Sequence, residues 1–110
     1  MLLPNAENAV IDINKLRDYC LNPQNETGKH KARVFAAALG LYRRDSVFLR
    51  NAILAAVRVE DAIIGVLNRH GQRYSVDFDM THAGKTASVR SVWIVDTRSI
   101  NPRLITCFVI

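Results

Sequence analysis

The hydrophobic positions of this sequence follow a helical spacing in its first half and an alternating spacing in its second. In three early stretches apolar residues recur every three or four positions, which predicts three amphipathic helices. Residues that favour helix ends flank each stretch. The expected spans are Asp12 or Asn14 to about Leu21, Thr27 to Gly40, and Asp45 or Ser46 to about Val57.

The second half alternates between apolar and polar residues, which is the pattern of half-buried strands. The clearest alternation covers residues 74–80, and two further strands are predicted at Ala87–Val95 and Leu104–Ile110. Two short apolar runs stay open. Ala9–Ile13 is a strand or an extended lead-in, and Ala62–Leu67 is a strand or an extension of the third helix.

Helices gathered before strands are typical of an α+β fold. The sequence therefore predicts two or three N-terminal helices packed on one side of a three- to four-stranded antiparallel meander sheet. At 110 residues, the chain is long enough to bury a core as one domain, residues 1–110, without disulfides or metals.

Cys20 and Cys107 lie far apart in the sequence, in apolar surroundings. We expect buried free thiols there, not a zinc site or a redox pair. No apolar run is long enough to span a bilayer, and the first eight residues lack the features of a signal peptide. A cytoplasmic protein that does not bind membranes is therefore expected.

Basic residues exceed acidic ones by 15 to 10, a formal net charge of +5, and eleven of the 15 are arginines. Such an excess favours an acidic partner, either nucleic acid or protein. The densest cluster opens the second predicted helix, where unpaired N–H groups and the helix dipole already attract anions. We therefore expect a phosphate or other anion site formed by Lys29, His30, Lys31 and Arg33.

Within this cluster, His30 is the residue type that exchanges protons near neutral pH. It lies opposite the apolar stripe of its helix, so a plain solvent-exposed position fits it as well. Arg90 stands in mid-strand, where an arginine is either exposed or paired, here with Asp77 or Asp79 on the neighbouring strand. These two aspartates have no third ligand beside them, so no metal site is expected.

Five segments of the chain carry a resemblance to a known family. They are Lys15–Pro23, Gly28–Phe35, Gly71–Tyr74, Val89–Trp93 and Pro102–Thr106. Together they resemble a widespread bacterial domain family whose members occur as short stand-alone proteins and as tails of larger toxin-like or phage-like chains. The resemblance covers nearly the whole chain and implies no particular activity.

The order of elements is similar to that of the barnase–EndoU–colicin–RelE superfamily of metal-independent RNases. Those proteins have two or three helices before a four-stranded meander that ends in a Thr-aromatic strand, here Thr106-Cys107-Phe108. The resemblance implies a site that combines basic residues of the second helix with strand residues. The matching positions are Lys29, His30, Lys31 or Arg33, Arg90 and Thr106, whereas His70 and His82 are expected in turns.

RNA cleavage without a metal needs a base, an acid and cations around one phosphate. The leading hypothesis is therefore a toxin-type RNase domain that uses no cofactor, and it requires Lys31 and Arg90 to face the same hollow. Its residues are His30 as acid or base, Lys31 and Arg90 as charge stabilisers, Thr106 as a phosphate hydrogen-bond donor, and Lys29, Arg33 and Arg103 as phosphate-binding residues.

Two other hypotheses stay open, so the sequence does not decide whether the chain is an enzyme. In one, a non-catalytic module binds nucleic acid or an acidic protein, such as an antitoxin or immunity protein. In the other, copies of the chain assemble through the last strand, Leu104–Ile110, an edge that no charge protects.

Overall fold

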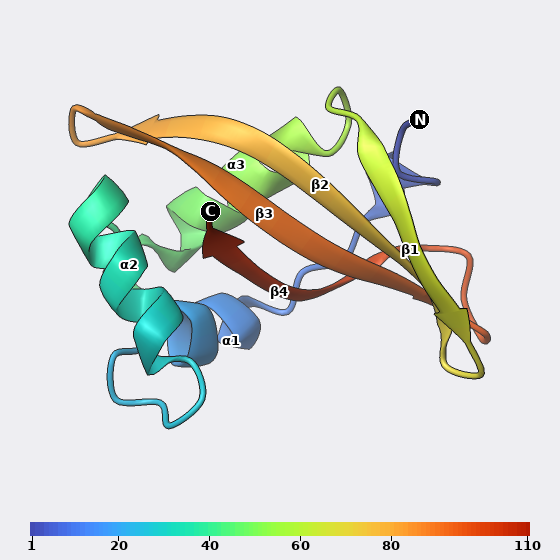
Figure 1. Ribbon diagram of the computed structural model, residues 1–110, viewed down its shortest axis with the longest axis horizontal. Helices are drawn as coiled ribbons and strands as arrows, with labels where there is room; N and C mark the ends of the chain where they lie inside the picture. Colours follow the sequence, from blue (N-terminus) through green and yellow to red (C-terminus); the bar gives the residue numbers. More distant parts are fainter.

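Three helical regions precede a four-stranded antiparallel sheet in the computed structural model, which describes residues 1–110, so the predicted α+β fold is confirmed (Figure 1). The helical elements are η1 (Ala6–Asn8), α1 (Ile13–Lys15), the π-helical segment η2 (Leu16–Cys20), α2 (Lys29–Leu39), η3 (Arg43–Asp45) and α3 (Ser46–Ala56). The strands are β1 (Ala62–Asn68), β2 (Gly71–His82), β3 (Lys85–Asp96) and β4 (Arg103–Val109).

The sheet is a meander in the order β1-β2-β3-β4. Its two long central strands pair along their whole length, from Gly71 opposite Asp96 to His82 opposite Lys85. In Figure 1, α3 lies behind β2 and β3, while α1 and α2 lie beside β4. One face of the sheet, called the outer face below, is therefore free of helices. The open question about Ala62–Leu67 is settled, because this run forms a strand.

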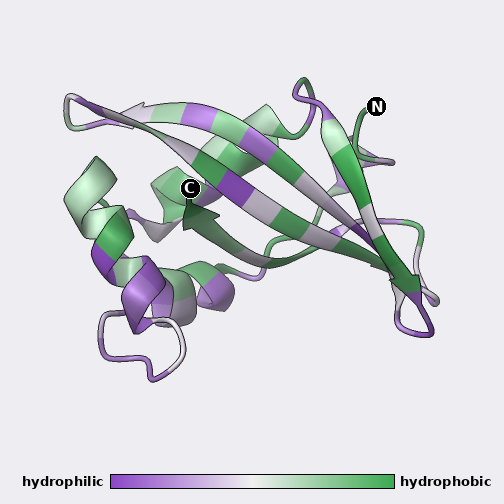
Figure 2. Ribbon diagram, in the orientation of Figure 1, coloured by the Kyte–Doolittle hydropathy of each residue, from purple (hydrophilic) through white to green (hydrophobic).

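The core lies between the inner face of the sheet and the helices. The alternation of the strands sends Val76, Val89 and Trp93 inward, where they pack with Phe35 and Ile53 from the helices. Figure 2 shows the corresponding alternation of polar and apolar residues along β2 and β3. None of the helices has the length and apolar character needed to cross a membrane.

The helix ends follow the sequence only in part. Asp12 caps α1 as expected, since its Oδ1 accepts from the backbone N–H of Asn14 at 2.9 Å. The expected cap at Thr27 is wrong, because the N-cap of α2 is Gly28. Asn25 replaces it, and its Oδ1 accepts from the backbone N–H groups of both Thr27 and Gly28.

The edge of β4 is less open than the sequence suggested. Val10 lies beside the start of β4 in a parallel bridge to Arg103. The N–H of Val10 donates to Pro102 O, and the N–H of Leu104 donates to Val10 O. The expectation of an unprotected edge along Leu104–Ile110 is therefore wrong for the start of this strand. Of the open run Ala9–Ile13, residues 9–12 are an extended lead-in and Ile13 begins α1.

Candidate functional site

Lys31 is the member of the basic cluster that the fold turns toward the sheet. Its Nζ donates a 2.7 Å hydrogen bond to Tyr19 Oη. The same Nζ lies 4.9 Å from the centre of the Tyr19 ring and 5.8 Å from that of Phe108. Because aromatic rings attract cations, Lys31 is held half-buried between η2, which carries Tyr19, and β4, which carries Phe108.

A close backbone approach brings Lys31 to this place. Gly28, at the start of α2, packs directly on η2, and a Cβ built on Gly28 would lie 2.2 Å from Tyr19 O. Asn25 holds the loop between them by donating from Nδ2 to Asp18 O at 3.1 Å. A side chain at position 28 would push the start of α2 away from Tyr19, so this close packing requires glycine.

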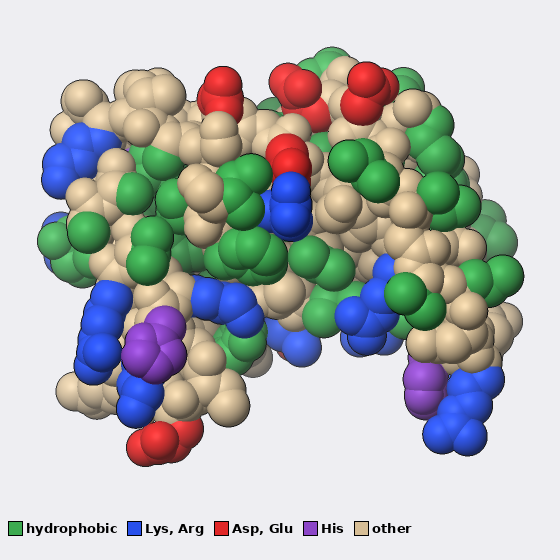
Figure 3. Space-filling view, in the orientation of Figure 1, with side chains coloured by type: hydrophobic (Ala, Val, Ile, Leu, Met, Phe, Trp, Pro, Cys, Tyr) green, Lys and Arg blue, Asp and Glu red, His purple; other side chains and the backbone are tan.

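A cavity of about 280 Å³ opens between α2 and the end of β4. It is lined by His30, Lys31, Val34, Phe108 and Val109. His30 is exposed at its rim, as its position opposite the apolar stripe predicts. In Figure 3 basic side chains and a histidine gather over the start of α2, next to apolar side chains of the sheet. The cavity therefore combines an apolar wall with titratable and cationic groups.

The register of β3 and β4 places the other predicted residues on the same face. Arg90 lies opposite Phe108, and Thr106 lies opposite Val92. Since side chains alternate along a strand, Arg90, Thr106 and Phe108 all belong to the outer face. Lys31 and Arg90 therefore lie on either side of the Phe108 ring on one face of the molecule, but they do not share the hollow that the RNase hypothesis required, because Arg90 does not line the cavity.

Arg90 is engaged in a paired contact on this face. Its Nε donates to Asp77 Oδ1 at 2.8 Å, and its Nη2 donates to Asp77 Oδ2 at 2.9 Å. The cross-strand pairing of Arg90 with Asp77 or Asp79 is thus confirmed, with Asp77 as the partner. Hydrogen bonding by Arg90 lowers the pKa of Asp77, and the carboxylate in turn raises the pKa of Arg90. The charge of Arg90 is largely balanced before any ligand arrives.

Thr106 faces the thiols at the edge of β4. Its Oγ1 lies 3.7 Å from Cys20 Sγ. Both cysteines are buried and free, as expected, but the fold brings them into contact despite their distance in the sequence. A hydrogen bond from Cys107, with help from Thr106 and the charge of Lys31, lowers the pKa of Cys20 to about 6. Hydrogen bonding to Cys20 and burial raise the pKa of Cys107. Lys31, Cys20 and Thr106 thus form one neighbourhood.

Three predicted phosphate-binding residues lie outside this group. Lys29 Nζ is 3.9 Å from Glu26 Oε2, and Arg33 is exposed on α2. Arg103 precedes Phe108 by five residues, about 16 Å along an extended strand, and its Nη2 is 3.6 Å from Asp96 Oδ2.

The remaining histidines and the acidic residues add no further group to the site. His82 ends β2 rather than lying in a turn, and its Nδ1 is 2.7 Å from Leu39 O. His70 lies in the turn between β1 and β2. Asp79 accepts from Ser88 Oγ. No group of three His, Cys, Asp or Glu side chains gathers closely enough to hold a metal ion.

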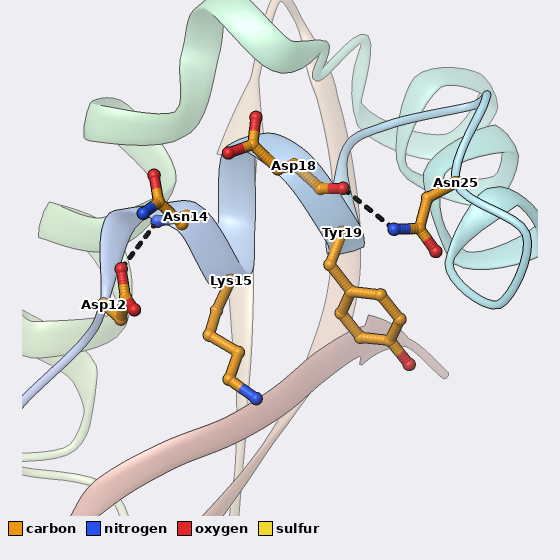
Figure 4. A pocket seen from close by; sticks show the side chains of 6 residues that line it. All are labelled: Asp12, Asn14, Lys15, Asp18, Tyr19 and Asn25. Atoms are coloured by element: carbon orange, nitrogen blue, oxygen red, sulfur yellow. Dashed lines mark hydrogen bonds between the residues drawn. The ribbon is translucent and has the colours of Figure 1, made fainter.

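Two aromatic residues of the site were not among the predicted ones. Tyr19 holds Lys31 and also lines a second hollow of about 340 Å³, with Lys15, Asn25 and three other residues of η2 and its surroundings (Figure 4). Phe108 forms the wall between Lys31 and Arg90. Both stand in segments that carry the family resemblance or the Thr-aromatic strand. The helical spacing of Leu16, Tyr19 and Cys20, however, predicts a buried apolar stripe, which favours a core position for Tyr19.

Comparisons with known proteins agree with this fold. A sequence model of the family described as "Domain of unknown function (DUF6883)" matches residues 2–110. No curated protein sequence matches the chain. Among solved structures, a chain of a contact-dependent growth inhibition toxin–immunity protein complex from Klebsiella pneumoniae 342 is similar, with a TM-score of 0.71 and 16% sequence identity. The alignment covers 94% of this chain and 95% of that chain. At this identity the likeness shows a shared fold.

Proposed function

The chain belongs to the DUF6883 family of domains of unknown function, and for this member we propose a metal-independent endoribonuclease activity of the toxin type. The observation that carries the proposal is the hydrogen bond of Lys31 to Tyr19 beside Phe108, on the face that also bears Arg90 and Thr106. Cationic, hydroxyl and aromatic groups meet there beside His30, the groups that cleavage at a phosphate requires.

Each residue has one role in the proposed reaction. His30 accepts the proton of the ribose 2′-OH, and the 2′ oxygen attacks phosphorus. The bond from phosphorus to the 5′ oxygen breaks, and Tyr19 donates its hydroxyl proton to that leaving oxygen. Because Lys31 already donates to Tyr19 Oη, it stabilises the phenolate that remains. Proton transfers by positioned side chains of this kind contribute about 10²- to 10⁴-fold each.

Charge stabilisation in the proposal comes from Lys31, Arg90 and the positive end of the α2 dipole. The pentavalent phosphate carries more negative charge than the bound RNA, so cations fixed in place favour the transition state over the ground state. Thr106 donates its hydroxyl to a phosphate oxygen. Lys29 and Arg33, on the exposed side of α2, contact neighbouring phosphates, and the more distant Arg103 contacts the strand farther along the sheet.

The aromatic residues favour a single-stranded substrate. Phe108 lines the apolar wall of the cavity, and Tyr19 lines the second hollow and accepts a hydrogen bond from Lys31, which lines the first. Bases of single strands stack on such rings without regard to sequence, worth about 1–3 kcal/mol per base. A strand whose bases occupy the two hollows would carry the intervening phosphate past Lys31 and Tyr19.

The comparison with solved structures agrees with a role in a toxin–immunity system, in which the similar chain is one of the two proteins. The similar chain comes from a complex of a growth-inhibition toxin with its immunity protein. By analogy, we expect an acidic protein that covers the basic start of α2 to inhibit this chain. The RNA substrate, this protein partner and the cytoplasmic location remain predictions of the proposal.

The first prediction tests cleavage directly. The pure chain, incubated with total RNA in EDTA, should produce fragments that end in 2′,3′-cyclic phosphates. Replacement of His30 by Ala removes the proposed base and should lower the cleavage rate about 10²- to 10⁴-fold. His70→Ala is the matched control, since it removes an exposed histidine in the distant β1–β2 turn and should leave the rate unchanged.

Lys31→Met keeps much of the side-chain volume but removes the cation, so it should also abolish cleavage while the fold is retained by circular dichroism. Intact RNA after incubation with the wild-type chain, or full activity in His30→Ala, would exclude this mechanism. RNA binding that weakens with salt but is never followed by cleavage would instead support the binding-module alternative. The Asp77 contact that neutralises Arg90 in the free chain is the observation that favours this alternative.

A further inference from the structure

The strand β1 exposes apolar side chains on both of its faces. It is the end strand of the sheet and pairs only with β2. Every residue after Ala62 is exposed, and Ile63, Ile64, Val66 and Leu67 are 59–73% exposed. Figures 1 and 2 show this strand as a largely hydrophobic element at the end of the sheet away from α1 and α2.

From Ile63 to Leu67 the strand lacks the usual protection of a sheet edge, whereas at its start the N–H of Ala62 donates to Met1 O at 2.6 Å and Asp61 lies 3.5 Å from the N-terminal ammonium. Natural edges carry charges or proline within the strand, or are covered by another segment. Between Ala62 and Leu67 there is no charged residue and no proline. Val59, just before the strand, adds a further exposed apolar side chain. Together these five side chains leave apolar groups exposed on both faces of one edge strand, and clusters of exposed apolar residues mark interaction sites on soluble proteins.

The residues around β1 are arranged symmetrically about Gly65. Two steps before and after it along the chain are Ile63 and Leu67, and one step away are Ile64 and Val66. Four steps away the charges are opposite, with Asp61 before the strand and Arg69 after it. Five positions before Gly65 is Glu60, and five positions after it is His70. If the segment pairs with an antiparallel copy of itself centred on Gly65, apolar residues therefore lie opposite apolar ones and acidic residues lie opposite basic ones.

We infer that β1 pairs antiparallel with β1 of a second copy of this chain, around a two-fold axis at Gly65. In this register Ile63 lies opposite Leu67 of the second copy, and Asp61 lies opposite Arg69 of the second copy. Each contact occurs twice, as a two-fold interface requires. The charge complementarity of the segment with itself is what identifies the occupant as a second copy.

Gly65 fits the centre of such a pairing. Its φ is not in the positive region, and a Cβ built on it would meet no atom of the chain closer than Arg73 O at 3.4 Å. The fold of the single chain thus does not require a glycine there. Glycine within a strand often marks a close approach of another backbone, and on the two-fold axis the two glycines would face each other without side chains.

The irregularity of β1 leaves room for this pairing. The register with β2 shifts between Ile64 and Leu67. Gln72 Nε2 donates to the carbonyl oxygens of Gly65 and Val66, at 2.9 and 3.3 Å. A carbonyl oxygen has two lone pairs, so Gly65 O and Val66 O can each still accept an N–H of the second copy.

The dimer would join two sheets into one of eight strands. The two-fold axis of an antiparallel strand pair stands perpendicular to the sheet, so the outer faces of both copies lie on the same side. The two candidate sites would then face one common direction, at opposite ends of the sheet.

Charge reversal tests both the interface and its register, with sedimentation of the full chain as the measurement. The wild type should show a concentration-dependent monomer–dimer equilibrium. Asp61→Arg and Arg69→Asp each place like charges opposite one another and should weaken the dimer at least tenfold. A 1:1 mixture of these two variants restores opposite charges at both ends and should associate as a heterodimer, and the double variant should dimerise with itself.

Matched controls separate this interface from other surfaces. Val66→Lys places a charge within β1 and should give a monomer with unchanged secondary structure, whereas Val47→Lys, an equal change at an exposed position of α3, should leave the dimer intact. A wild type that stays monomeric at the highest concentration that sedimentation can measure would refute the inference. A dimer that survives Val66→Lys but not Val109→Lys would place the interface on β4 and would refute it equally.

Discussion

At the scale of single residues, the contact between Asp77 and Arg90 decides what the outer face offers to a ligand. The two-point hydrogen bond balances the arginine, whose side chain is still 40% exposed. Such a half-exposed pair stabilises a fold only modestly. Its larger effect is on function, because a phosphate must compete with Asp77 for the same guanidinium.

Replacement of Asp77 by Asn should therefore increase affinity for single-stranded RNA. The freed Arg90 adds one phosphate contact, so the logarithmic salt dependence of binding should steepen by about 0.7. Asp79→Asn is the matched control, because it removes the same charge from the same strand face without releasing Arg90. If both variants raise RNA affinity equally, the effect comes from the change in net charge and not from the release of Arg90.

The same variant has a predictable pH dependence. Hydrogen bonding by Arg90 lowers the pKa of Asp77 below its unfolded value. The stabilisation is therefore complete above an ordinary carboxyl pKa of about 3.9 and is lost as the pH falls through the lower folded value. The difference in unfolding midpoint between wild type and Asp77→Asn should be constant above about pH 5 and shrink below about pH 4.

At the scale of elements, the site depends on how the start of α2 sits on η2. Neither element carries the site alone, since Lys31 comes from one and Tyr19 from the other. π-helical segments are often found at functional sites, and η2 supplies both Tyr19 and Cys20. The two elements make their closest contact at Gly28, whose Cα packs against the backbone of Tyr19.

Gly28→Ala should therefore disturb stability and site together. The new Cβ would meet Tyr19 O at 2.2 Å, so α2 must shift away from η2. Overpacking of this kind costs about 1–3 kcal/mol, and the shift should break the hydrogen bond of Lys31 to Tyr19. Denaturant unfolding and RNA cleavage measure the two effects. Thr27→Ala, an exposed change one residue earlier, should alter the free energy of unfolding by less than about 0.5 kcal/mol. An equal loss in this control would show that the contact of Gly28 with Tyr19 is not what positions α2.

At the scale of the whole molecule, the core contains a chain of two hydrogen bonds, called the relay below, that links β3 to β2. Trp93 Nε1 donates to Ser91 Oγ at 2.9 Å, and Ser91 Oγ donates to Val76 O at 2.8 Å. All three residues have no exposed surface. Because buried polar groups need partners, Ser91 joins β2 and β3 behind the outer face that carries the site.

Ser91→Ala should destabilise the whole chain by about 1–3 kcal/mol, since it leaves the indole N–H of Trp93 unpaired in the core. Thermal unfolding measures the loss. Addition of Trp93→Phe removes the unpaired donor, so the double variant should lose less than the sum of the two single losses. Additive losses would show that the relay contributes nothing as a unit.

Much of the secondary structure was predictable because it depends on local spacing. The apolar stripe around Phe35 and Leu39 required a helix, and the alternation over residues 74–80 required a strand. The start of α2 was predicted wrongly, with a cap at Thr27, because Asn25 satisfies the N–H groups of this turn through a loop contact. Ala62–Leu67 was ambiguous for a related reason, as an apolar run with both faces exposed has no period that separates helix from strand.

The candidate site divides in the same way. Its basic cluster and its cross-strand ion pair were visible in the sequence, because the cluster is contiguous and strand pairing follows from a meander. Tyr19 and Phe108 were missed as site residues, since an aromatic residue on an apolar stripe is ordinarily assigned to the core. Only the contact of η2 with α2 turned Tyr19 toward a lysine.

Most elements, their order, the charge and the residue types at the start of α2 follow from the sequence alone, because they depend on neighbours within a few positions. Which of these residues come into contact depends on the three-dimensional packing. Packing of Gly28 on Tyr19 and the register of β4 on β3 bring Lys31, Phe108 and Arg90 to one face. Arg103 stays outside this group, about 16 Å from Phe108 along the strand. Such contacts join residues far apart in the chain, and they are fixed by how whole elements fit against each other rather than by local preference.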